Sequence, residues 1–343
     1  MSLSEAGPVW SNDQGTAARP LVWRRSLTWL GLAICLVAIV TFREWAEMVH
    51  QWWNIDTYTH ILLVPLIGLW LVWLKTGELA KIEPRPWGPG LFVVAAALGL
   101  WLTGRVTGMN LVAHAGAVGA LQGAILAVLG VRVGVLIALP VAYLAFLVPF
   151  GDEIIPPLQS ITARLAIALT QVSGVPAVID GIYIDTPAGL FIVAEECSGV
   201  KFLIAMVTLA VLVAFTRFES WRLRVAFLAA SIVVPVLANG ARAWGTIYIA
   251  QFAGIEFAAG FDHIFYGWVF FALVVACLLA GAWPFFEIEP EEYGLTAREV
   301  AERPWVARLE RHGVSASVAV AAIAAMALCA GFAAALLAPY GLA

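Results

Sequence analysis

The sequence predicts an all-α polytopic membrane protein with about eight or nine transmembrane helices. Hydrophobic residues make up 62% of its 343 residues, whereas charged residues make up only 12%. A water-soluble domain of this composition would expose large apolar patches. Apolar runs that approach the ~20 residues needed to cross a bilayer recur between charged or turn-forming breaks. The chain length leaves no room for a large soluble domain beside these spans.

The polar segment 1–22 is expected to be a cytoplasmic tail. An apolar run over 27–42 follows, and because no A-x-A-like cleavage site comes after it, we predict an uncleaved first span and not a signal peptide. The mixed-charge segment 284–314 is interpreted as a solvated cytoplasmic connector. The chain is thus divided into the tail, a membrane domain at 23–283, the connector and a C-terminal transmembrane helix at 315–343. Within this division the further candidate spans are 61–74, 88–104, 112–131, 133–150, 199–216, 225–244, 264–283 and 315–338.

The distribution of Lys and Arg predicts that the N-terminus is cytoplasmic. Basic residues near span ends stay on the cytoplasmic side. With the N-terminus inside, all but five of the 19 Lys and Arg residues fall on inner segments, the exceptions being Arg43, Arg105, Arg164, Lys201 and Arg242. This orientation places the long connection 151–198 at the outer face. The net charge of −4 is weak, and no basic patch suggests nucleic-acid binding.

The outer connection 151–198 is predicted to be structured. Pro156 and Pro157 precede the stretch 158–172, in which apolar and polar positions interleave as in a short helix lying in the membrane interface. Between 178 and 193, Asp-Gly and Pro-Ala-Gly turn signals separate β-branched and aromatic residues, which predicts a small hairpin. The hairpin leads directly into a polar stretch that contains a cysteine.

Cys197 is the one cysteine placed to do chemistry. The other three cysteines lie within apolar runs, at Cys35, Cys277 and Cys329. No paired spacing among the four predicts a disulfide or a metal site. Gly199 opens a span, so the helix dipole and Lys201 favour a thiolate, whereas Glu195 and Glu196 disfavour it. Taken alone, Cys197 also fits a small buried residue. A catalytic role therefore requires a partner base.

Two further side chains are expected at the depth of Cys197. His263 begins the eighth span, and Arg242 is the single charge in the seventh; His312 is excluded because it lies on the inner side. Singly, Arg242 fits a snorkelling anchor and His263 an interfacial histidine. Together, Cys197 would attack a carbonyl, His263 would shuttle the proton and Arg242 would stabilise the oxyanion. Asn239, on the same helical face as Arg242, adds a donor or holds the arginine.

Several ordered motifs resemble those of the exosortases, the multi-spanning cysteine transpeptidases related to archaeosortases. The resemblance runs from about residue 50 to 280. Its three main motifs are Ala194-Glu195-Glu196-Cys197-Ser198-Gly199, Asn239-Gly240-x-Arg242 and Asp262-His263-x-x-Tyr266-Gly267-Trp268-x-Phe270. Two upstream stretches are also similar, namely Tyr58-x-His60 with Leu63-Val64-Pro65, and Asp185-Thr186-Pro187-x-Gly189-x-Phe191.

The resemblance implies a cysteine peptidase or transpeptidase of the bacterial inner membrane, with the membrane domain 23–283 as its catalytic domain and an active site facing the periplasm. Family substrates carry a C-terminal sorting signal: a Pro-Glu-Pro motif, a transmembrane helix and a basic tail. The family's catalytic residues map onto Cys197, Arg242 and His263, with a thioester at the cysteine that an unknown acceptor resolves. The family often occurs alongside exopolysaccharide genes. We expect no cofactor and no metal.

The supporting residues depart in places from the family pattern. The position after Cys-Ser-Gly-aliphatic is commonly Arg and here is Lys201, so recognition of the substrate's glutamate would be looser or would use another cation such as Arg164. Glu196 and Asp262 are solvated charges in the simplest interpretation, with substrate contact or histidine orientation as the alternative.

Tyr58 and His60 complete the set of supporting candidates through the upstream motif. His60 is followed by Ile61, where the family frequently has Gly. Neither this departure nor the one at Lys201 changes the proposed catalytic residues, but both bear on subtype and substrates.

Two other functions remain open. A transporter or exopolysaccharide export component would have polar or Gly/Pro-interrupted segments at mid-membrane depth, whereas the polar groups here cluster at one surface, which favours an enzyme. A hydrolytic intramembrane cysteine protease that uses water as the acceptor has the same motifs. The sequence does not separate hydrolysis from transpeptidation.

Overall fold

The computed structural model describes residues 14–261 and 269–337, and helices dominate these residues. Among them, seven helices are long and apolar enough to cross a membrane, and up to nine if each of two bent helix pairs counts as one span. The expected all-α polytopic membrane protein is thus confirmed. The seven candidate spans are Leu21–Val40, Asp56–Leu74, Gly90–Thr107, Asn110–Leu136, Glu195–Arg217, Trp221–Ala253 and Ala316–Leu337.

The chain forms two compact units, each built from separate stretches of sequence. The first unit holds most of the N-terminal half and the C-terminal end, at Met1–Val49, Pro65–Val148 and Leu295–Ala343. The second unit holds the predicted site residues that the structure describes, at His50–Val64 and Pro149–Gly294.

The first unit contains two long helices at its ends, α1 (Gln14–Val40) and α15 (Ala316–Leu337), packed with α5 (Gly90–Thr107) and α6 (Asn110–Leu136). Helix α1 begins inside the segment expected to be a polar tail. Small residues let α5 and α6 approach closely, since a Cβ on Gly104 would lie 2.3 Å from the backbone nitrogen of Ala113. Close backbone approach at small residues is the usual way in which membrane helices pack. The unit's shorter helices are α2 (Phe42–Asn54, which runs into the second unit), α3 (Val64–Leu74), α4 (Thr76–Leu79), α7 (Ala138–Tyr143), α13 (Ala297–Glu302) and α14 (Pro304–Glu310).

Helix α6 differs from the two spans expected at 112–131 and 133–150. It continues to Leu136 across a break at Gly130, where φ is +87° and a Cβ would lie 1.8 Å from the Arg85 carbonyl oxygen. The adjoining chain uses carbonyls next to the break: Arg85 N–H donates to Leu129 O, and Trp87 N–H to Ala127 O. The residues after α6 form only the short α7 and the 3₁₀ turn Leu144–Leu147. The expected fifth span is therefore not one continuous helix.

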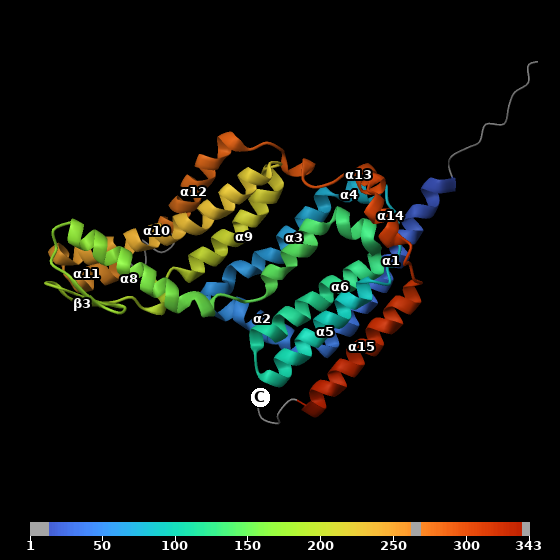
Figure 1. The fold of residues 1–343 in the computed structure, drawn as a ribbon, viewed down its shortest axis with the longest axis horizontal. Coiled ribbons are helices and arrows are strands. Elements are labelled where there is room, and N and C mark those ends of the chain that lie inside the picture. Colours follow the sequence, from blue (N-terminus) through green and yellow to red (C-terminus); the bar gives the residue numbers. More distant parts are fainter. Residues whose placement is uncertain (1–13, 262–268, 338–343) are drawn as a thin grey trace, which may run out of the picture. The chain divides into compact units, whose positions relative to one another are not determined.

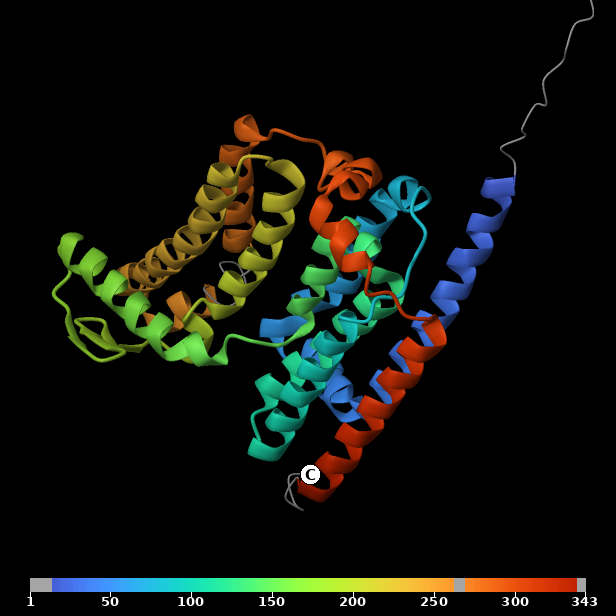
Figure 2. The same cartoon turned by 45° about the vertical axis from the view of Figure 1, so that its right-hand side comes forward.

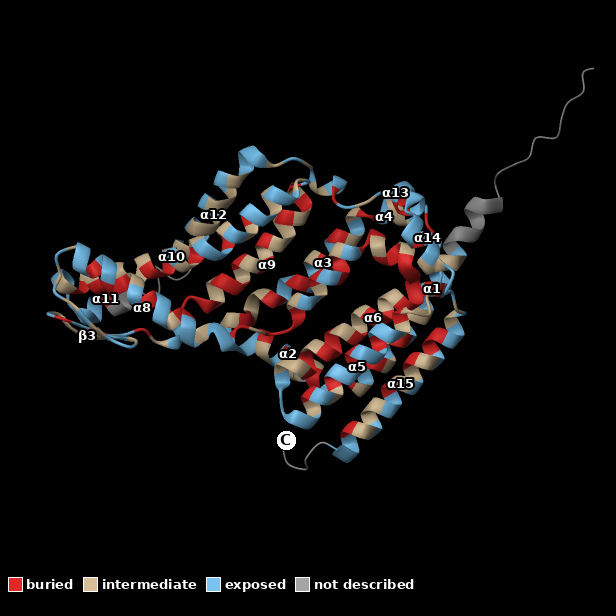
Figure 3. Cartoon of the chain, viewed as in Figure 1, coloured by how far each residue is buried: buried red, intermediate tan, exposed pale blue. Residues whose placement is uncertain are grey.

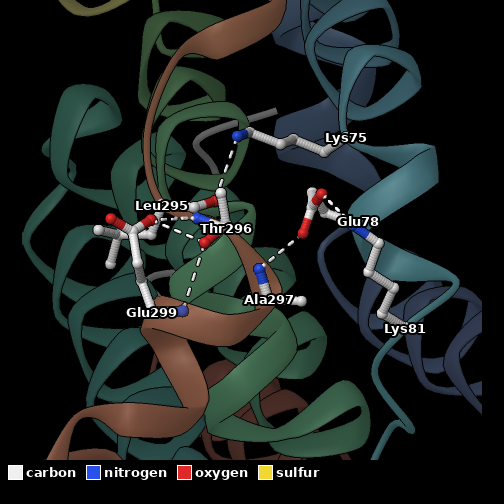
Figure 4. Close-up of polar contacts among 7 residues, drawn as sticks. All are labelled: Lys75, Glu78, Lys81, Leu295, Thr296, Ala297 and Glu299. Atoms are coloured by element: carbon white, nitrogen blue, oxygen red, sulfur yellow. Dashed lines mark hydrogen bonds and ion pairs between the residues drawn. The ribbon is translucent and has the colours of Figure 1, made fainter.

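Segments that the Lys and Arg pattern assigns to the inner face lie together in the first unit. Lys75, which is 3% exposed, donates through Nζ to the carbonyl of Leu295. Ala297, the first residue of α13, donates its N–H to the Glu78 carboxylate (Figure 4). Burial holds the pKa of Lys75 below its usual range, although Glu78 and Glu299 oppose this. The connector is thereby fastened to the segment after α3. Three further pairs join the same segments: Trp87 Nε1 with Leu309 O, Trp23 Nε1 with Ile82 O, and Arg132 with Glu310.

The second unit packs α8 (Ile155–Val172) and α9 (Val200–Arg217) against the long α10 (Trp221–Ala253). Helix α10 extends well beyond the expected span 225–244, with Pro235 inside it. Asn239 and Arg242 therefore lie within the helix and not at its end. The unit also contains the 3₁₀ helix η1 (Asp56–Leu63), the 3₁₀ turns η3 (Asp152–Ile154) and η4 (Glu195–Cys197), and helices α11 (Ile255–Phe261) and α12 (Phe271–Ala282).

The outer connection forms a three-stranded antiparallel meander in place of the single hairpin expected. Its strands are β1 (Val178–Asp180), β2 (Tyr183–Thr186) and β3 (Gly189–Ile192), in the order β1-β2-β3. Each of the two predicted turn signals closes its own two-residue hairpin, so one extra strand results. One face of the sheet packs on α8, as the two ribbon views show (Figure 1, Figure 2).

Candidate functional site

Cys197 ends a tight turn immediately before α9. Its N–H donates to the Ala194 carbonyl at 3.0 Å, and the next N–H, of Ser198, donates to the Glu195 carbonyl at 3.0 Å. Gly199 then adopts a left-handed conformation with φ of +81°, which glycine reaches without the cost that a Cβ imposes. The helix begins at Val200, whose N–H donates to Ser198 Oγ. The local sequence thus fixes the thiol at the N-terminal end of α9.

Asn239 of α10 holds this turn in place. Its Nδ2 donates to the carbonyl of Cys197 at 2.8 Å and to Thr162 Oγ1 of α8 at 3.0 Å. Asn239 is 6% exposed and Thr162 1%, so both bonds are made away from water. A Cβ on Gly199 would lie 2.7 Å from Asn239 Cγ, so the turn and the amide are closely fitted. The sequence offered Asn239 as a donor or as a support for Arg242, and the structure shows it positioning the backbone of Cys197.

Cys197 and Arg242 line the same pocket of about 70 Å³. They come from separate elements, the turn before α9 and the middle of α10. Asn239 and Thr246 also line the pocket. The rest of its wall is apolar and comes from the meander and from α10, at Ile184, Phe191, Ile192, Val193, Ala243 and Ile247. Charge–charge interactions are stronger in such a setting than in water. A guanidinium here is suited to stabilise an anion that forms beside the thiol.

Arg242 also contacts a group of aromatic side chains. Its Cζ lies 5.9 Å from the ring centroid of Phe202 in α9, and that ring stacks on Phe271 of α12 with a centroid distance of 4.7 Å. A second, smaller pocket lies among Phe202, Phe271 and Arg242. The guanidinium is therefore held where α9, α10 and α12 meet.

The acidic neighbours of Cys197 face a different pocket. Glu195 and Glu196 are exposed, and with Lys201 they line a polar pocket of about 290 Å³ that also includes Asp56 and Asp152. Lys201 Nζ lies 5.2 Å from the ring centroid of Phe202. These three charges are not among the residues that line the Cys197 pocket.

The remaining supporting candidates are placed as follows. Tyr58, which is 3% exposed, donates through its hydroxyl to Asp152 Oδ1 at 2.7 Å and so ties η1 to η3. His60 Nδ1 lies 3.1 Å from the carbonyl oxygen of Thr57. Arg164 is exposed on α8 and does not line the Cys197 pocket. The structure therefore does not bring these three side chains to the thiol.

His263 and Asp262 lie outside the described residues, so the structure gives no position for the predicted base or its neighbour. In the parts of the chain that are described, no group of three or more His, Cys, Asp or Glu side chains is arranged to hold a metal ion.

Two supporting residues were not singled out from the sequence. Thr162 accepts the Asn239 amide, and Gln159 Nε2 donates to the carbonyl of Val193 at 2.8 Å. Both lie on the face of α8 that packs toward the site. Their spacing of three residues in a largely apolar helix was the available signal, because polar residues at that spacing share one helical face.

Comparison with known proteins identifies the family. The family model described as transmembrane exosortase (Exosortase_EpsH) matches residues 52–280. No curated protein and no solved structure matches the chain significantly. The matched range includes Cys197, Asn239 and Arg242, the three residues that the structure brings together, and it covers more than half of the chain. The chain belongs to the transmembrane exosortase family.

Proposed function

We propose that this exosortase is a membrane cysteine transpeptidase that cleaves C-terminal Pro-Glu-Pro-type sorting signals and transfers the substrate to an acceptor. One observation carries the proposal: Cys197 and Arg242 share a small, mostly apolar pocket, and Asn239 fixes the turn that bears the thiol. The pocket provides a nucleophile and a fixed cation beside it. These are two of the three groups that acyl transfer through an oxyanion requires, and the third is the base.

The reaction proceeds in two steps. The Cys197 thiolate attacks the scissile carbonyl, and Arg242 stabilises the oxyanion of the tetrahedral intermediate. The C–N bond then breaks, His263 gives its proton to the leaving amine, and a thioester remains on the cysteine. In the second step His263 takes a proton from the acceptor, which attacks the thioester and releases the thiolate. An amine or hydroxyl acceptor gives a transpeptidase, and water gives a hydrolase.

Helix lengths favour a position of the site at one membrane boundary. About 20 residues cross the hydrocarbon core, so a span that starts at Trp221 reaches the other side near Gly240. Cys197 lies just before α9, and Asn239 of α10 donates to its carbonyl, so the thiol lies at the depth of this part of α10. The Lys and Arg pattern makes this side periplasmic. The joined inner segments of the first unit support that pattern.

Substitution of the two central residues tests the proposal. Cys197→Ala should abolish processing of a Pro-Glu-Pro-tailed substrate in membrane vesicles, while Cys277→Ala, which removes an exposed thiol of α12, should leave processing unchanged. Arg242→Lys should be severely impaired, because a lysine lacks the planar fork of donors. Processing by Cys197→Ala at the wild-type rate would overturn the proposal.

Two measurements resolve the alternatives. The mass of the new C-terminus on the processed substrate separates a free carboxylate, made by hydrolysis, from an attached acceptor. A membrane-impermeant maleimide added from the periplasmic side should modify Cys197, with Cys197→Ala as the blank. Modification of Cys197 from the cytoplasmic side alone would show that the orientation is the reverse of the one proposed.

A further inference from the structure

Beside the pocket that Cys197 and Arg242 share, the outward edge of strand β3 also points to a ligand. The meander has the order β1-β2-β3, so β3 pairs with β2 on one side only. An edge strand presents a row of backbone N–H and C=O groups that can pair with another extended chain. Native proteins usually block such an edge unless it has a partner.

The register identifies which groups point outward. Thr186 pairs with Gly189 across the two-residue turn, and Val193 N–H donates to the Ile182 carbonyl at 3.0 Å. In an antiparallel ladder the residues alternate between bonding the partner strand and facing away from it. The backbone groups of Leu190 and Ile192 therefore face away from β2.

Among the described residues, no second strand pairs with these outward groups. Within the described residues, no backbone hydrogen bond joins Leu190 or Ile192 to a segment other than β2. Their side chains are 64% and 51% exposed, and exposed residues recur along the meander in the burial view (Figure 3). The other edge strand of the meander is β1. Just before it, the carbonyl of Ala177 already accepts a hydrogen bond from Gln171 Nε2.

The open edge leads to the thiol. Ile192, the last residue of β3, lines the pocket that Cys197 and Arg242 share. Four residues separate it along the chain from Cys197, and Gln159 holds the carbonyl of the first of them, Val193. A strand laid along β3 would therefore enter the Cys197 pocket at one end.

We propose that β3 binds the substrate's extended recognition segment as an added strand and delivers the scissile bond to Cys197. The inference rests on the proposed function and adds the binding mode. Main-chain hydrogen bonds provide affinity in this mode, and alternate side chains provide specificity. Leu190 and Ile192 together offer two N–H donors and two C=O acceptors.

A Pro-x-Pro segment fits such an edge. Proline has no N–H and is tolerated in a strand only where that position faces away from the partner. Two prolines that are two residues apart face the same way, since the strand repeats every two residues. Both prolines can therefore face away from β3 while the residue between them uses its N–H and C=O to bond it. A segment with adjacent prolines does not satisfy this pattern.

Replacing one outward donor tests the mode. Leu190→Pro removes an N–H that the β2 ladder does not use, whereas Leu190→Val keeps it at the same exposed position. With a synthetic Pro-Glu-Pro peptide as the probe, the proline variant should process at least about threefold more slowly than the valine variant, as loss of a modest hydrogen bond implies. Equal processing by the two variants would overturn the binding mode.

A substrate variant provides the second measurement and decides the result if Leu190→Pro also perturbs folding. A peptide with an N-methyl group on the central glutamate lacks the donor that faces β3, so the wild-type enzyme should process it several-fold more slowly. Processing of the methylated peptide at the unmethylated rate overturns the inference. The Cys197→Ala variant is measured in the same assays. If it is inactive while either of these results contradicts the binding mode, the binding mode has failed and the proposed chemistry has not.

Discussion

Replacing Gly199 by alanine should destabilise the Cys197 turn by about 2 to 5 kcal/mol. The residue has φ of +81°, and a left-handed conformation costs a residue with a Cβ about 1–2 kcal/mol. The new Cβ would also lie 2.7 Å from Asn239 Cγ, so the amide must move. Asn239 would then lose its bonds to Cys197 O and Thr162 Oγ1, at about 0.5–1.5 kcal/mol each. Thermal unfolding in detergent and the processing rate measure the effect.

Gly174→Ala is the matched control. Gly174 follows α8 with the same φ of +81°, but a Cβ there meets nothing within 4 Å. Its alanine variant should lose only the conformational term of about 1–2 kcal/mol and keep most of its activity. Equal losses of stability in the two alanine variants would refute the fitted contact between Gly199 and Asn239.

A double-mutant cycle isolates the contact further. Asn239→Ala alone should destabilise the turn, because the buried carbonyl of Cys197 and hydroxyl of Thr162 lose their donor. In that background Gly199→Ala no longer meets the amide and should cost only the conformational term. Residues in contact show this non-additivity, whereas independent residues do not. Strict additivity of the two substitutions would show that the amide does not oppose the new Cβ.

Four further substitutions test contacts outside the thiol pocket by thermal unfolding. Tyr58→Phe should lower stability by about 1.5–3 kcal/mol, because it removes the hydroxyl that donates to the charged Asp152, and an unchanged Tm would argue against that bond. Arg132→Met breaks the 2.6 Å ion pair with Glu310 and should lower stability by about 1 kcal/mol. Arg85→Met should lower it less, because the pair of Arg85 with the same carboxylate is 3.9 Å long and more exposed. A larger loss of stability for Arg85→Met would contradict this interpretation. Hydrogen bonds from Lys81 and from the Ala297 N–H hold the pKa of Glu78 below its ordinary value, so its contribution is present at neutral pH and lost as pH falls through the lowered pKa. Glu78→Gln should flatten the acid limb of the Tm–pH curve, and an unchanged limb would exclude that role.

The membrane class of the fold was predictable because it depends on composition and on the length of apolar runs. Helix breaks were less predictable. Gly130 interrupts α6 only because the chain at Arg85 supplies donors to the carbonyls near the break, a contact between residues far apart in sequence. Likewise, the Pro-Ala-Gly turn signal was recognised, but whether it closed the same hairpin as Asp180-Gly181 or a second one depended on tertiary packing against α8.

The site was predictable in its residues more than in its contacts. A charge and an amide three residues apart in an apolar helix indicated Arg242 and Asn239, since such groups are costly in a membrane. The partner of Asn239 is a backbone carbonyl, and main-chain acceptors leave no mark in sequence. The length of α10 was also underestimated, because its continuation to Ala253 contains polar residues that read as a membrane boundary.

The geometry of the turn accounts for a cysteine flanked by two carboxylates. Successive residues of a 3₁₀ turn point about 120° apart, so Cys197 faces the apolar pocket with Arg242 while Glu195 and Glu196 face the polar one. Water and salt screen the exposed carboxylates, whereas the guanidinium acts on the sulfur through apolar surroundings. Arg242→Met should therefore slow alkylation of Cys197 by iodoacetamide at neutral pH several-fold, and Glu196→Gln should change it little. Equal and opposite effects of the two substitutions would show that the carboxylate acts on the thiol as strongly as the arginine does.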